Sequence, residues 1–367
     1  MHRPGIISSE LLIGSKKQNV NNMVKELLRK LSNAHGVSGS EGSVFAVIKK
    51  ELKGYVDEIT EDSMGNLIAV KHGNKLKVML AAHMDEIGLM VKYIDDKGFL
   101  RFITLGGWYA PTLYNQRVIV HGTKGDRIGV IGGKPPHMMD DEERKKGVKV
   151  DEMFIDVGAQ NRDEVAELGI EIGTPITIDR EFAELSNNRV TGKAFDNRAG
   201  VAMLIKTMQK MKSPFTVYAV FTVQEEVGLK GAKTSAFTIN PDWAVATDVT
   251  IPGDHPGIEM RDAAIEMGKG PVITIVDSSG RGLIANRKVV QWLKNAAESH
   301  DIPVQFEVGT GGTTDATSIH LTRGGIPSTT ISPPARYIHS PVEVLDIRDI
   351  EGGVNLLVAA LKVKPAV

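Results

Sequence analysis

The sequence predicts an α/β fold with a smaller all-β domain inserted into it. Long helical patterns alternate with short apolar runs over residues 180–367, which is typical of α/β domains. Over residues 87–179, short β-rich runs follow one another with turn residues between them. Residues 23–86 contain a further helix and a further apolar run, so we expect them to complete the α/β domain on the other side of the insert.

The composition is that of an ordinary globular chain. Of 367 residues, 41% are apolar and 24% are charged, enough for one large domain or two modest ones. The 44 basic and 45 acidic residues nearly balance, so nothing favours nucleic acid, and a small molecule or another copy of the chain is the expected partner. Cysteine is absent, which leaves His, Asp and Glu to bind any metal. No apolar run reaches the roughly 18 residues that span a bilayer, and the chain start lacks a signal peptide's apolar stretch, so we expect a cytoplasmic location without membrane contact.

The elements before the insert are an arm, two helices and a strand. Residues 1–22 are polar and irregular, so we expect an N-terminal extension with little order. A helical pattern begins at Met23, and a second helix follows near residues 44–48, whose apolar positions fit a period near 3.6. Ser38 or Ser40 could cap this second helix. The continuous apolar run KLKVMLAAHMDE then predicts a strand that is covered on both faces.

The insert and the second half of the α/β domain follow. Within the insert, the charged stretch 134–153 is expected to form an exposed loop or a short solvated helix. We expect His137, which lies in this stretch, to be a surface residue rather than a metal ligand. After the insert, the helical pattern at 199–211 alternates with buried strands predicted at 215–223, 242–249 and 271–277.

Acidic residues and histidines stand at the ends of these apolar runs. In an open α/β sheet, ligands bind outside the carboxyl ends of the strands, so the residues that end each run are candidates for a site. The chain lacks thiols, and two histidines with several carboxylates fall at this expected rim. The candidates are His83, Asp85, Asp196, Glu225, Glu226, Asp248 and His339.

Each candidate also has a structural explanation when it is taken alone. Asp196 precedes a helix, and for that residue in isolation we favour an N-cap over catalysis. Glu225 and Glu226 could end a strand in solvent, and His83 or His339 alone is more often a structural histidine. Their convergence on one edge of the sheet instead favours a metal site.

The residue types favour two metal ions over one. A catalytic zinc ion takes about three protein ligands and keeps one position open, and a paired site needs a carboxylate that bridges. Asp196, at a turn between the two halves of the candidate set, is the plausible bridge. In His83-x-Asp85, both side chains lie on one face of a strand, where the Asp85 carboxylate can accept a ring N–H and orient the histidine for metal binding.

Several separated motifs together resemble a known family. HMDE, FDNR, QEEVG, ATDV and RYIHSPVE occur in the order and at the separations found in the TET and glutamyl (deblocking) aminopeptidases, a branch of the binuclear zinc exopeptidases. The likeness extends from about Met23 to about Val363. It implies a mixed-sheet α/β/α catalytic domain, formed by residues 23–86 and 180–367, with a PDZ-like β-barrel at 87–179 that serves as a dimerisation domain.

The resemblance also implies a role for each candidate residue. Glu225 would be the general base, because a carboxylate free of metal can take a proton from water and pass it to the leaving amine. Asp85 would assist catalysis by orienting a ligand. The implied cofactors are two divalent ions, zinc or cobalt, bound by His83, Asp196 and Asp248 at one site and by Asp196, Glu226 and His339 at the other. The implied substrates are short peptides with a free N-terminus, and the implied assembly is a dodecamer built from dimers, with active sites that face an internal chamber.

Other functions stay open on the sequence. A metal-dependent deacylase or carboxypeptidase would share the ligands but should display an arginine or a similar group for the substrate carboxylate. A glycosidase of the endoglucanase type would use two carboxylates without metal, and the two histidines count against it. A non-catalytic scaffold conflicts with an intact Glu225 and five intact ligand positions.

The glycine-rich segment GTGGTTDA, residues 309–316, is a further motif. It lacks the lysine of a phosphate-binding loop and is more simply a tight loop, and the resemblance implies that it lies beside the substrate cleft. We assign no catalytic role to Thr313, Thr314 or Asp315. The sequence chooses neither between zinc and cobalt nor among acidic, neutral and basic N-terminal residues of the substrate.

Overall fold

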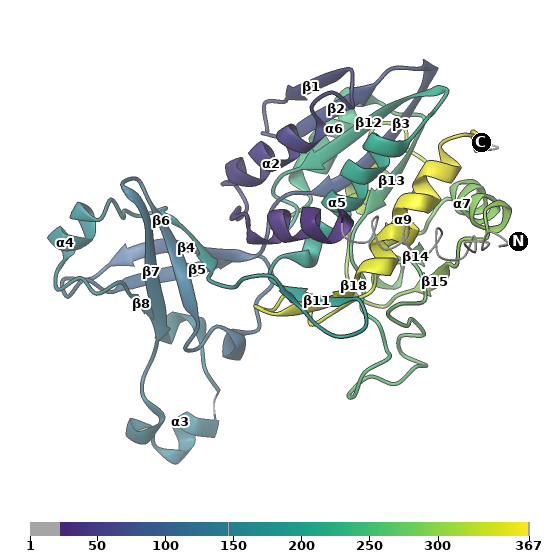
Figure 1. Cartoon of the computed structure of the whole chain (residues 1–367). Helices are drawn as coiled ribbons and strands as arrows, with labels where there is room; N and C mark the ends of the chain where they lie inside the picture. Colours follow the sequence, from purple (N-terminus) through teal and green to yellow (C-terminus); the bar gives the residue numbers. More distant parts are fainter. Residues whose placement is uncertain (1–22, 146, 366–367) are drawn as a thin grey trace, which may run out of the picture.

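The computed structural model describes residues 23–145 and 147–365, and Figure 1 shows a sheet with helices on both faces beside a smaller β-barrel. The predicted α/β fold with an inserted β-barrel is therefore confirmed. The expected arm at residues 1–22 lies outside the described residues. Within the described ranges, every helix is too short or too polar to cross a bilayer.

The large sheet is mixed and has eight strands. Its four neighbouring strands β12, β3, β13 and β16 run parallel, whereas β2 and β14 pair antiparallel at the two sides of this group. The carboxyl ends of the four parallel strands therefore meet at one edge. The order is β1 (Glu58–Glu61), β2 (Leu67–Lys71), β12 (Phe215–Thr222), β3 (Asn74–His83), β13 (Trp243–Thr247), β16 (Ser328–Ser332), β14 (Val272–Val276) and β15 (Gln305–Val308).

Helices cover both faces of this sheet because alternate residues of the buried strands point to opposite sides. The larger core joins one face to the helix at residues 23–33, α2 (Gly42–Leu52), α5 (Phe195–Lys210), α7 (Arg287–Ser299) and α9 (Ile347–Ala360). The smaller core joins the other face to α6 (Lys230–Ile239) and α8 (Asp315–Ile319). Val78 and Leu80 of β3 belong to the first core and Met79 to the second, as expected for a strand covered on both faces.

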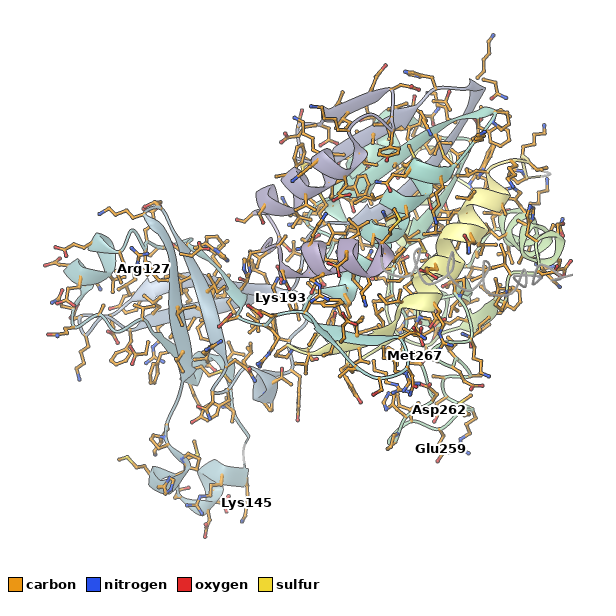
Figure 2. The ribbon with its side chains drawn as sticks, viewed as in Figure 1. Arg127, Lys145, Lys193, Glu259, Asp262 and Met267 are labelled. Atoms are coloured by element: carbon orange, nitrogen blue, oxygen red, sulfur yellow. The ribbon has the colours of Figure 1, made fainter. Side chains whose placement is uncertain are left out.

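The barrel has six strands and a hydrophobic core of its own. Its charged stretch contains helix α3 (Asp141–Lys145) and the 3₁₀ helices Pro136–Met138 and Val150–Glu152. Lys145, the last residue of α3, lies far from the large sheet (Figure 2). Helix α4 (Arg162–Glu167) lies near the opposite end of the barrel (Figure 1). The strand order is β4 (Gly88–Ile94), β5 (Leu100–Leu105), β8 (Phe154–Asp156), β7 (Gly125–Gly132), β6 (Arg117–Gly122) and β9 (Pro175–Ile178).

A four-stranded sheet and a buried ion pair connect the barrel to the rest of the chain. The small sheet has the order β10 (Ala183–Glu184), β11 (Arg189–Gly192), β18 (Glu343–Asp346) and β17 (Ala335–Arg336), so it joins the chain leaving the barrel to the C-terminal segment. After β11, Lys193 lies at the junction of the two domains (Figure 2). Its Nζ is 2.8 Å from the Glu86 carboxylate, and both side chains are nearly inaccessible to solvent.

Two expected helix caps are absent. Helix α2 has Glu41 at its N-cap without a side-chain hydrogen bond, and the Ser38 hydroxyl instead donates to Asp85 Oδ2 at 2.6 Å. At the start of α5, Asn197 Oδ1 accepts the N–H of Gly200 at 3.0 Å, whereas Asp196 has a non-helical ψ of 104°. Asn197 therefore caps the regular part of the helix, and the Asp196 side chain is left for another use.

Candidate metal centre

The seven candidate residues meet at the carboxyl-end edge of the parallel strands. His83 is the last residue of β3, the two glutamates follow β12, and Asp248 follows β13 directly. Asp196 lies in the first turn of α5, and His339 lies in the turn between β17 and β18. The parallel registers that pair β3 with β12 and β13 therefore bring together residues far apart in the sequence.

The Asp196 carboxylate lies between the two histidines. His83 Nε2 is 3.1 Å from Asp196 Oδ1, and His339 Nε2 is 3.3 Å from Asp196 Oδ2, so each oxygen faces one imidazole. His83 Nε2 is also 3.8 Å from a carboxylate oxygen of Asp248. His339 Nε2 is 3.3 Å from Glu226 Oε2. This is the arrangement that a bridging carboxylate between two metal ions requires.

The imidazole and carboxylate atoms of the site could hold divalent metal. Two sets of three residues could each hold a metal ion, because the ligand atoms within each set all lie within 4.8 Å of one another. One set is His83, Glu225 and Asp248, and the other is His83, Asp196 and Glu226. Glu225 Oε2 and Asp248 Oδ1 are equally distant from His83 Nε2, at 3.8 Å, so distance alone does not separate base from ligand. In the part of the chain that the structure describes, the buried Glu226 Oε1 has no hydrogen-bond partner, as expected of an atom that a cation would satisfy.

A turn after β12 lets two adjacent glutamates face one site. Gln224 has a φ of 56°, which reverses the chain direction, and the Asp85 carboxylate accepts the N–H groups of Glu225 and Glu226 at 3.0 and 3.2 Å. The His83 ring N–H is not directed mainly at the Asp85 carboxylate, contrary to the prediction from the sequence. Its Nδ1 is 3.1 Å from the Asp85 backbone oxygen but 3.5 Å from the carboxylate. The carboxylate is thus held by the Ser38 hydroxyl and by the turn that carries the glutamates.

The crowding of carboxylates keeps protons on both imidazoles when no metal is present. For His83, burial lowers the pKa, but Glu225, Asp196, Asp85 and Asp248 outweigh it and raise the pKa well above the usual value. For His339, burial also lowers the pKa, but the contacts with Asp196 and Glu226 raise it to about 11. The carboxylates therefore favour positive charge at the site, and in the metal-free protein this charge comes from the protonated imidazoles.

The acidic groups of the site differ among themselves. Burial raises the pKa of Asp196, but its hydrogen bonds with the two histidines dominate and hold the pKa below the usual range. Burial raises the pKa of Glu225 and of Asp248 well above the usual values, against the charge of His83. A carboxyl group with a raised pKa is suited to accept and then release a proton near neutrality.

Residues outside the predicted set also reach the site. Glu343 accepts the backbone N–H groups of Asp196 at 3.0 Å and His339 at 3.2 Å. From the barrel, Gly106 and Gly107 approach the ligands so closely that an added Cβ would lie 3.0 Å from Glu226 Oε2 and 2.9 Å from His339 Nδ1, respectively. Glu343 belongs to the motif RYIHSPVE, which is a usable signal, whereas no pattern in the insert marks the two glycines.

A cavity of about 800 Å³ opens from the metal centre toward β14 and β15. Its wall includes Thr313 and Thr314 of the glycine-rich segment, as expected for a loop beside the substrate cleft. Asp315 is buried, and its Oδ2 accepts the hydroxyl of Thr222 at 2.5 Å. Among the described residues that line the cavity there is neither lysine nor arginine.

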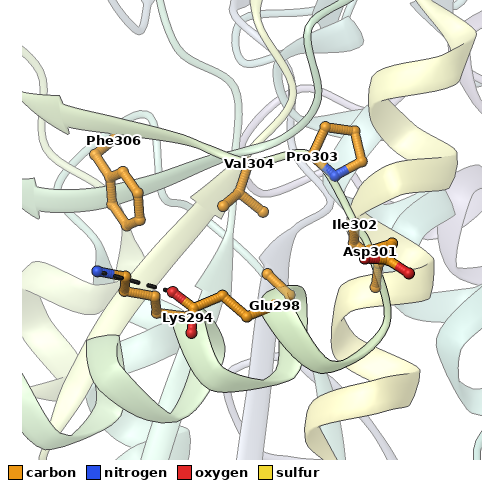
Figure 3. A pocket seen from close by; sticks show the side chains of 8 residues that line it. Lys294, Glu298, Asp301, Ile302, Pro303, Val304 and Phe306 are labelled. Atoms are coloured by element: carbon orange, nitrogen blue, oxygen red, sulfur yellow. Dashed lines mark ion pairs between the residues drawn. The ribbon is translucent and has the colours of Figure 1, made fainter.

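A second hollow, of about 390 Å³, lies between α7 and β15 (Figure 3). Its wall carries Ile302, Val304 and Phe306, and an ion pair of 3.9 Å between Lys294 and Glu298. No histidine lines it among the described residues, so it provides no comparable ligand set.

The chain is similar to proteins of known class over nearly its whole length. Residues 65–356 match the family model described as M42 glutamyl aminopeptidase. The lysyl aminopeptidase of Pyrococcus furiosus is 37% identical, over 92% of this chain and 96% of that protein. The solved structure of aminopeptidase APDkam598 from Desulfurococcus kamchatkensis matches with a TM-score of 0.90 and 45% identity, over 94% of this chain and 96% of that one. The Pyrococcus horikoshii TET1 peptidase, which can assemble into a tetrahedron or a large octahedral shell, matches with a TM-score of 0.83 and 34% identity, over 92% of this chain and 99% of that one.

Proposed function

The chain belongs to the M42 glutamyl aminopeptidase family and is a peptidase of the aminopeptidase type, and from this premise we propose that it removes N-terminal residues from short peptides with Glu225 as the general base. The observation that carries the proposal is Asp196, whose two carboxylate oxygens each face one histidine at 3.1 and 3.3 Å. This supports a paired metal centre at the floor of the cavity.

The ligands in this proposal are two overlapping sets. His83, Asp196 and Asp248 would hold one divalent ion, and Asp196, Glu226 and His339 would hold the other. When bound, two such ions polarise the scissile carbonyl and lower the pKa of water at the site. Zinc and cobalt are the proposed ions, because both accept imidazole and carboxylate ligands.

Glu225 is the proton carrier of the proposal. Its side chain is 10% exposed, with Oε2 3.8 Å from His83 Nε2, and its backbone N–H donates to the Asp85 carboxylate. Glu225 takes a proton from the attacking water and delivers it to the nitrogen of the leaving peptide. Burial raises the pKa of this carboxyl group well above the usual value, which favours its acceptance of a proton.

The peptidase alternatives are less well supported by the cavity. A carboxypeptidase needs a cation for the substrate carboxylate, and the described cavity wall offers neither arginine nor lysine. A free α-amine, by contrast, suits a wall on which Asp262, Asp277 and Glu307 remain in addition to the metal-site carboxylates.

We further propose that the protein works as a large homo-oligomer, a dodecamer built from dimers through the barrel. The support is the likeness to the P. horikoshii TET1 peptidase. A size measurement that gives a monomer at micromolar concentration would contradict this. The cytoplasmic location expected from the sequence stays a prediction.

The experiment that tests the function is a panel of aminoacyl chromogenic substrates with free amines, beside their N-acetylated forms. The protein is assayed as purified, after chelation, and after zinc or cobalt is returned. We expect cleavage of free-amine substrates only, lost on chelation and restored by metal. Cleavage that survives chelation, or a preference for the acetylated forms, would contradict the proposal.

A further inference from the structure

Glu343 occupies a position from which it can control the metal centre without lining the cavity. It is the first residue of β18 and is 1% exposed. In the small sheet it pairs with Gly192, the last residue of β11, and the chain runs from there through three residues to Asp196. On its other side, the turn that carries His339 leads directly into β18. Glu343 therefore stands between the backbones of two proposed ligands.

The carboxylate of Glu343 gives one oxygen to each of these backbones. Oε2 accepts the N–H of Asp196 at 3.0 Å, and Oε1 accepts the N–H of His339 at 3.2 Å. The side chains of the same two residues meet at 3.3 Å, between Asp196 Oδ2 and His339 Nε2. One rigid planar group thus sets the separation of two backbones whose side chains must converge on one ion.

The His339 turn needs such a contact because its backbone is intrinsically unfavourable. Tyr337 and His339 have φ values of 63° and 60°, in the left-handed region that side chains with a Cβ disfavour. The His339 side chain is 39% exposed, so packing alone holds it weakly. Without its hydrogen bond to Glu343, the turn would relax toward ordinary φ values and carry the imidazole away from Asp196.

Asp85 provides the same arrangement on the opposite side of the centre. Its carboxylate accepts the N–H groups of Glu225 and Glu226 at 3.0 and 3.2 Å. Two buried carboxylates therefore each hold a pair of neighbouring functional residues by their backbones. Such outer contacts commonly change metal affinity by about 10- to 100-fold when they are removed.

We propose that Glu343 is a positioning residue that holds Asp196 and His339 at the separation needed to bind the metal ion they share with Glu226. The inference rests on the proposed function for the presence of that ion. It predicts a larger effect on this ion than on the other, because Glu343 holds two of its ligands, Asp196 and His339, and only the shared Asp196 of the other set.

The first test is a cobalt titration of metal-free protein, followed by the visible absorption of the ion and by calorimetry. Glu343→Gln keeps the size of the side chain but turns one of its two acceptors into a donor. We expect wild-type protein to bind two ions per subunit. The variant should bind the ion held by Asp196, Glu226 and His339 about 10- to 100-fold more weakly, with a smaller loss for the other ion, which shares only Asp196. Glu343→Asp keeps both acceptor oxygens on a shorter side chain, so its metal affinity should lie between those of wild type and Glu343→Gln. It replaces Glu343→Gln in the experiment if the glutamine variant does not fold.

The matched control is Asp349→Asn. Asp349 is fully buried and accepts two backbone N–H groups, from Gly268 at 2.6 Å and Gly270 at 2.8 Å, and none of these residues lines the cavity. This variant should lose stability to a similar degree and still bind both ions normally. Equal loss of binding in the two variants, or normal binding of both ions by Glu343→Gln, would overturn the proposal.

A second readout separates this inference from the proposed function. Hydrogen exchange of the Asp196 and His339 amides in metal-free protein should be faster in Glu343→Gln than in wild type. If wild-type protein binds no metal but this difference is present, the proposed function fails while the positioning role stands. If the two amides exchange equally in both proteins, the positioning role fails, whatever the metal content.

Discussion

Glu225 and Glu226 are neighbours with the same side chain, and their surroundings give them different tasks. Glu226 Oε2 faces His339, while within the described residues its Oε1 has no partner. Glu225 instead faces His83 and lies in an environment in which burial raises its pKa well above the usual value. Burial raises the pKa of Glu226 as well, so the proposed division rests on geometry: the unpartnered Oε1 of Glu226 leaves an atom for a cation, while Glu225 lies beside His83.

This division predicts different outcomes for the two glutamine variants. Glu225→Gln should lower kcat by about 100- to 10,000-fold, because the proton carrier is removed, and should still bind two metal ions. Glu226→Gln should lose one of the two ions. Metal analysis beside steady-state kinetics measures both effects. Loss of an ion in Glu225→Gln with retention of both in Glu226→Gln would exchange the two roles.

The histidines predict a pH dependence for the metal-free protein. The folded pKa of His339 is raised to about 11, above the value near 6.5 expected in the unfolded chain. The folded state therefore binds this proton more tightly, and the stabilisation is complete below pH 6.5 and is lost as the pH rises toward 11. Thermal unfolding of chelated protein should show a falling midpoint from pH 7 to pH 10.

The control for this effect is His339→Gln, which should show a shallower fall over the same range. Metal-loaded protein should not show the fall, because binding requires the unprotonated imidazole. A chelated wild-type protein that is as stable at pH 10 as at pH 7 would contradict the argument.

The site could be predicted as far as side-chain chemistry marks it. Six of the seven candidates lie together because each follows a strand or starts a helix at the same edge, which a sequence pattern reveals, whereas His339 comes from the turn between β17 and β18. Glu343 was missed although it ends the motif RYIHSPVE, because its partners are backbone N–H groups and the motif was interpreted only for His339. The N-cap expectation for Asp196 was wrong because the adjacent Asn197 competes for the same task and makes the hydrogen bond. The individual roles in catalysis and metal binding stay predictions.

Strand β16 shows why some elements escape sequence reasoning. Its residues STTIS are all buried, yet four of the five are hydroxyl residues that break the apolar pattern expected of a buried strand. The hydroxyls are satisfied locally. Thr329 donates to the carbonyl of Thr274 at 2.7 Å, and Thr330 contacts the hydroxyl of Thr314 at 2.9 Å. The strands with continuous apolar runs, such as β3 and β12, were predicted because they need no such partners.

From the position of the loop after β5, we predict that the barrel is part of the active site. An alanine at Gly107 would place its Cβ 2.9 Å from His339 Nδ1, closer than real Cβ atoms come to other atoms. Gly107→Ala should therefore displace the imidazole and lower kcat by about 10- to 100-fold. Kinetics and metal analysis at saturating metal would measure it.

Gly42→Ala is the matched control, because an added Cβ at the start of α2 meets nothing within 4 Å. It should leave both the activity and the metal content unchanged. Full activity in Gly107→Ala would mean that the barrel loop does not constrain His339.

The charge of the cavity as a whole predicts which substrates the protein prefers. Beyond the metal-site groups, Asp262, Asp277 and Glu307 line the wall, and no lysine or arginine faces them among the described lining residues. Glu307 accepts the Thr250 hydroxyl at 2.7 Å. Burial raises the pKa of Glu307 and of Asp277, so both carry their negative charge, and oppose an acidic group, more fully as the pH rises. A substrate with an acidic first residue should therefore be repelled.

We expect kcat/KM to be at least about 10-fold lower for an N-terminal glutamate than for lysine, with leucine as the uncharged reference. Glu307→Gln should reduce the ratio between lysine and glutamate while leaving leucine nearly unchanged. Faster cleavage of glutamate than of lysine would show that charge on the wall does not select the substrate.

The division into an interrupted α/β domain and a barrel has a consequence for how the chain folds. Strand β3 pairs with β12 and β13, so the centre of the sheet cannot form until the chain has been made past the barrel and through residue 247. The barrel closes on itself through β4 and β9, and its contacts can form earlier during synthesis. The last proposed ligand, His339, is made after all of these. A nascent chain that has not reached His339 therefore lacks the full ligand set, so binding of both ions would report that synthesis has passed this residue.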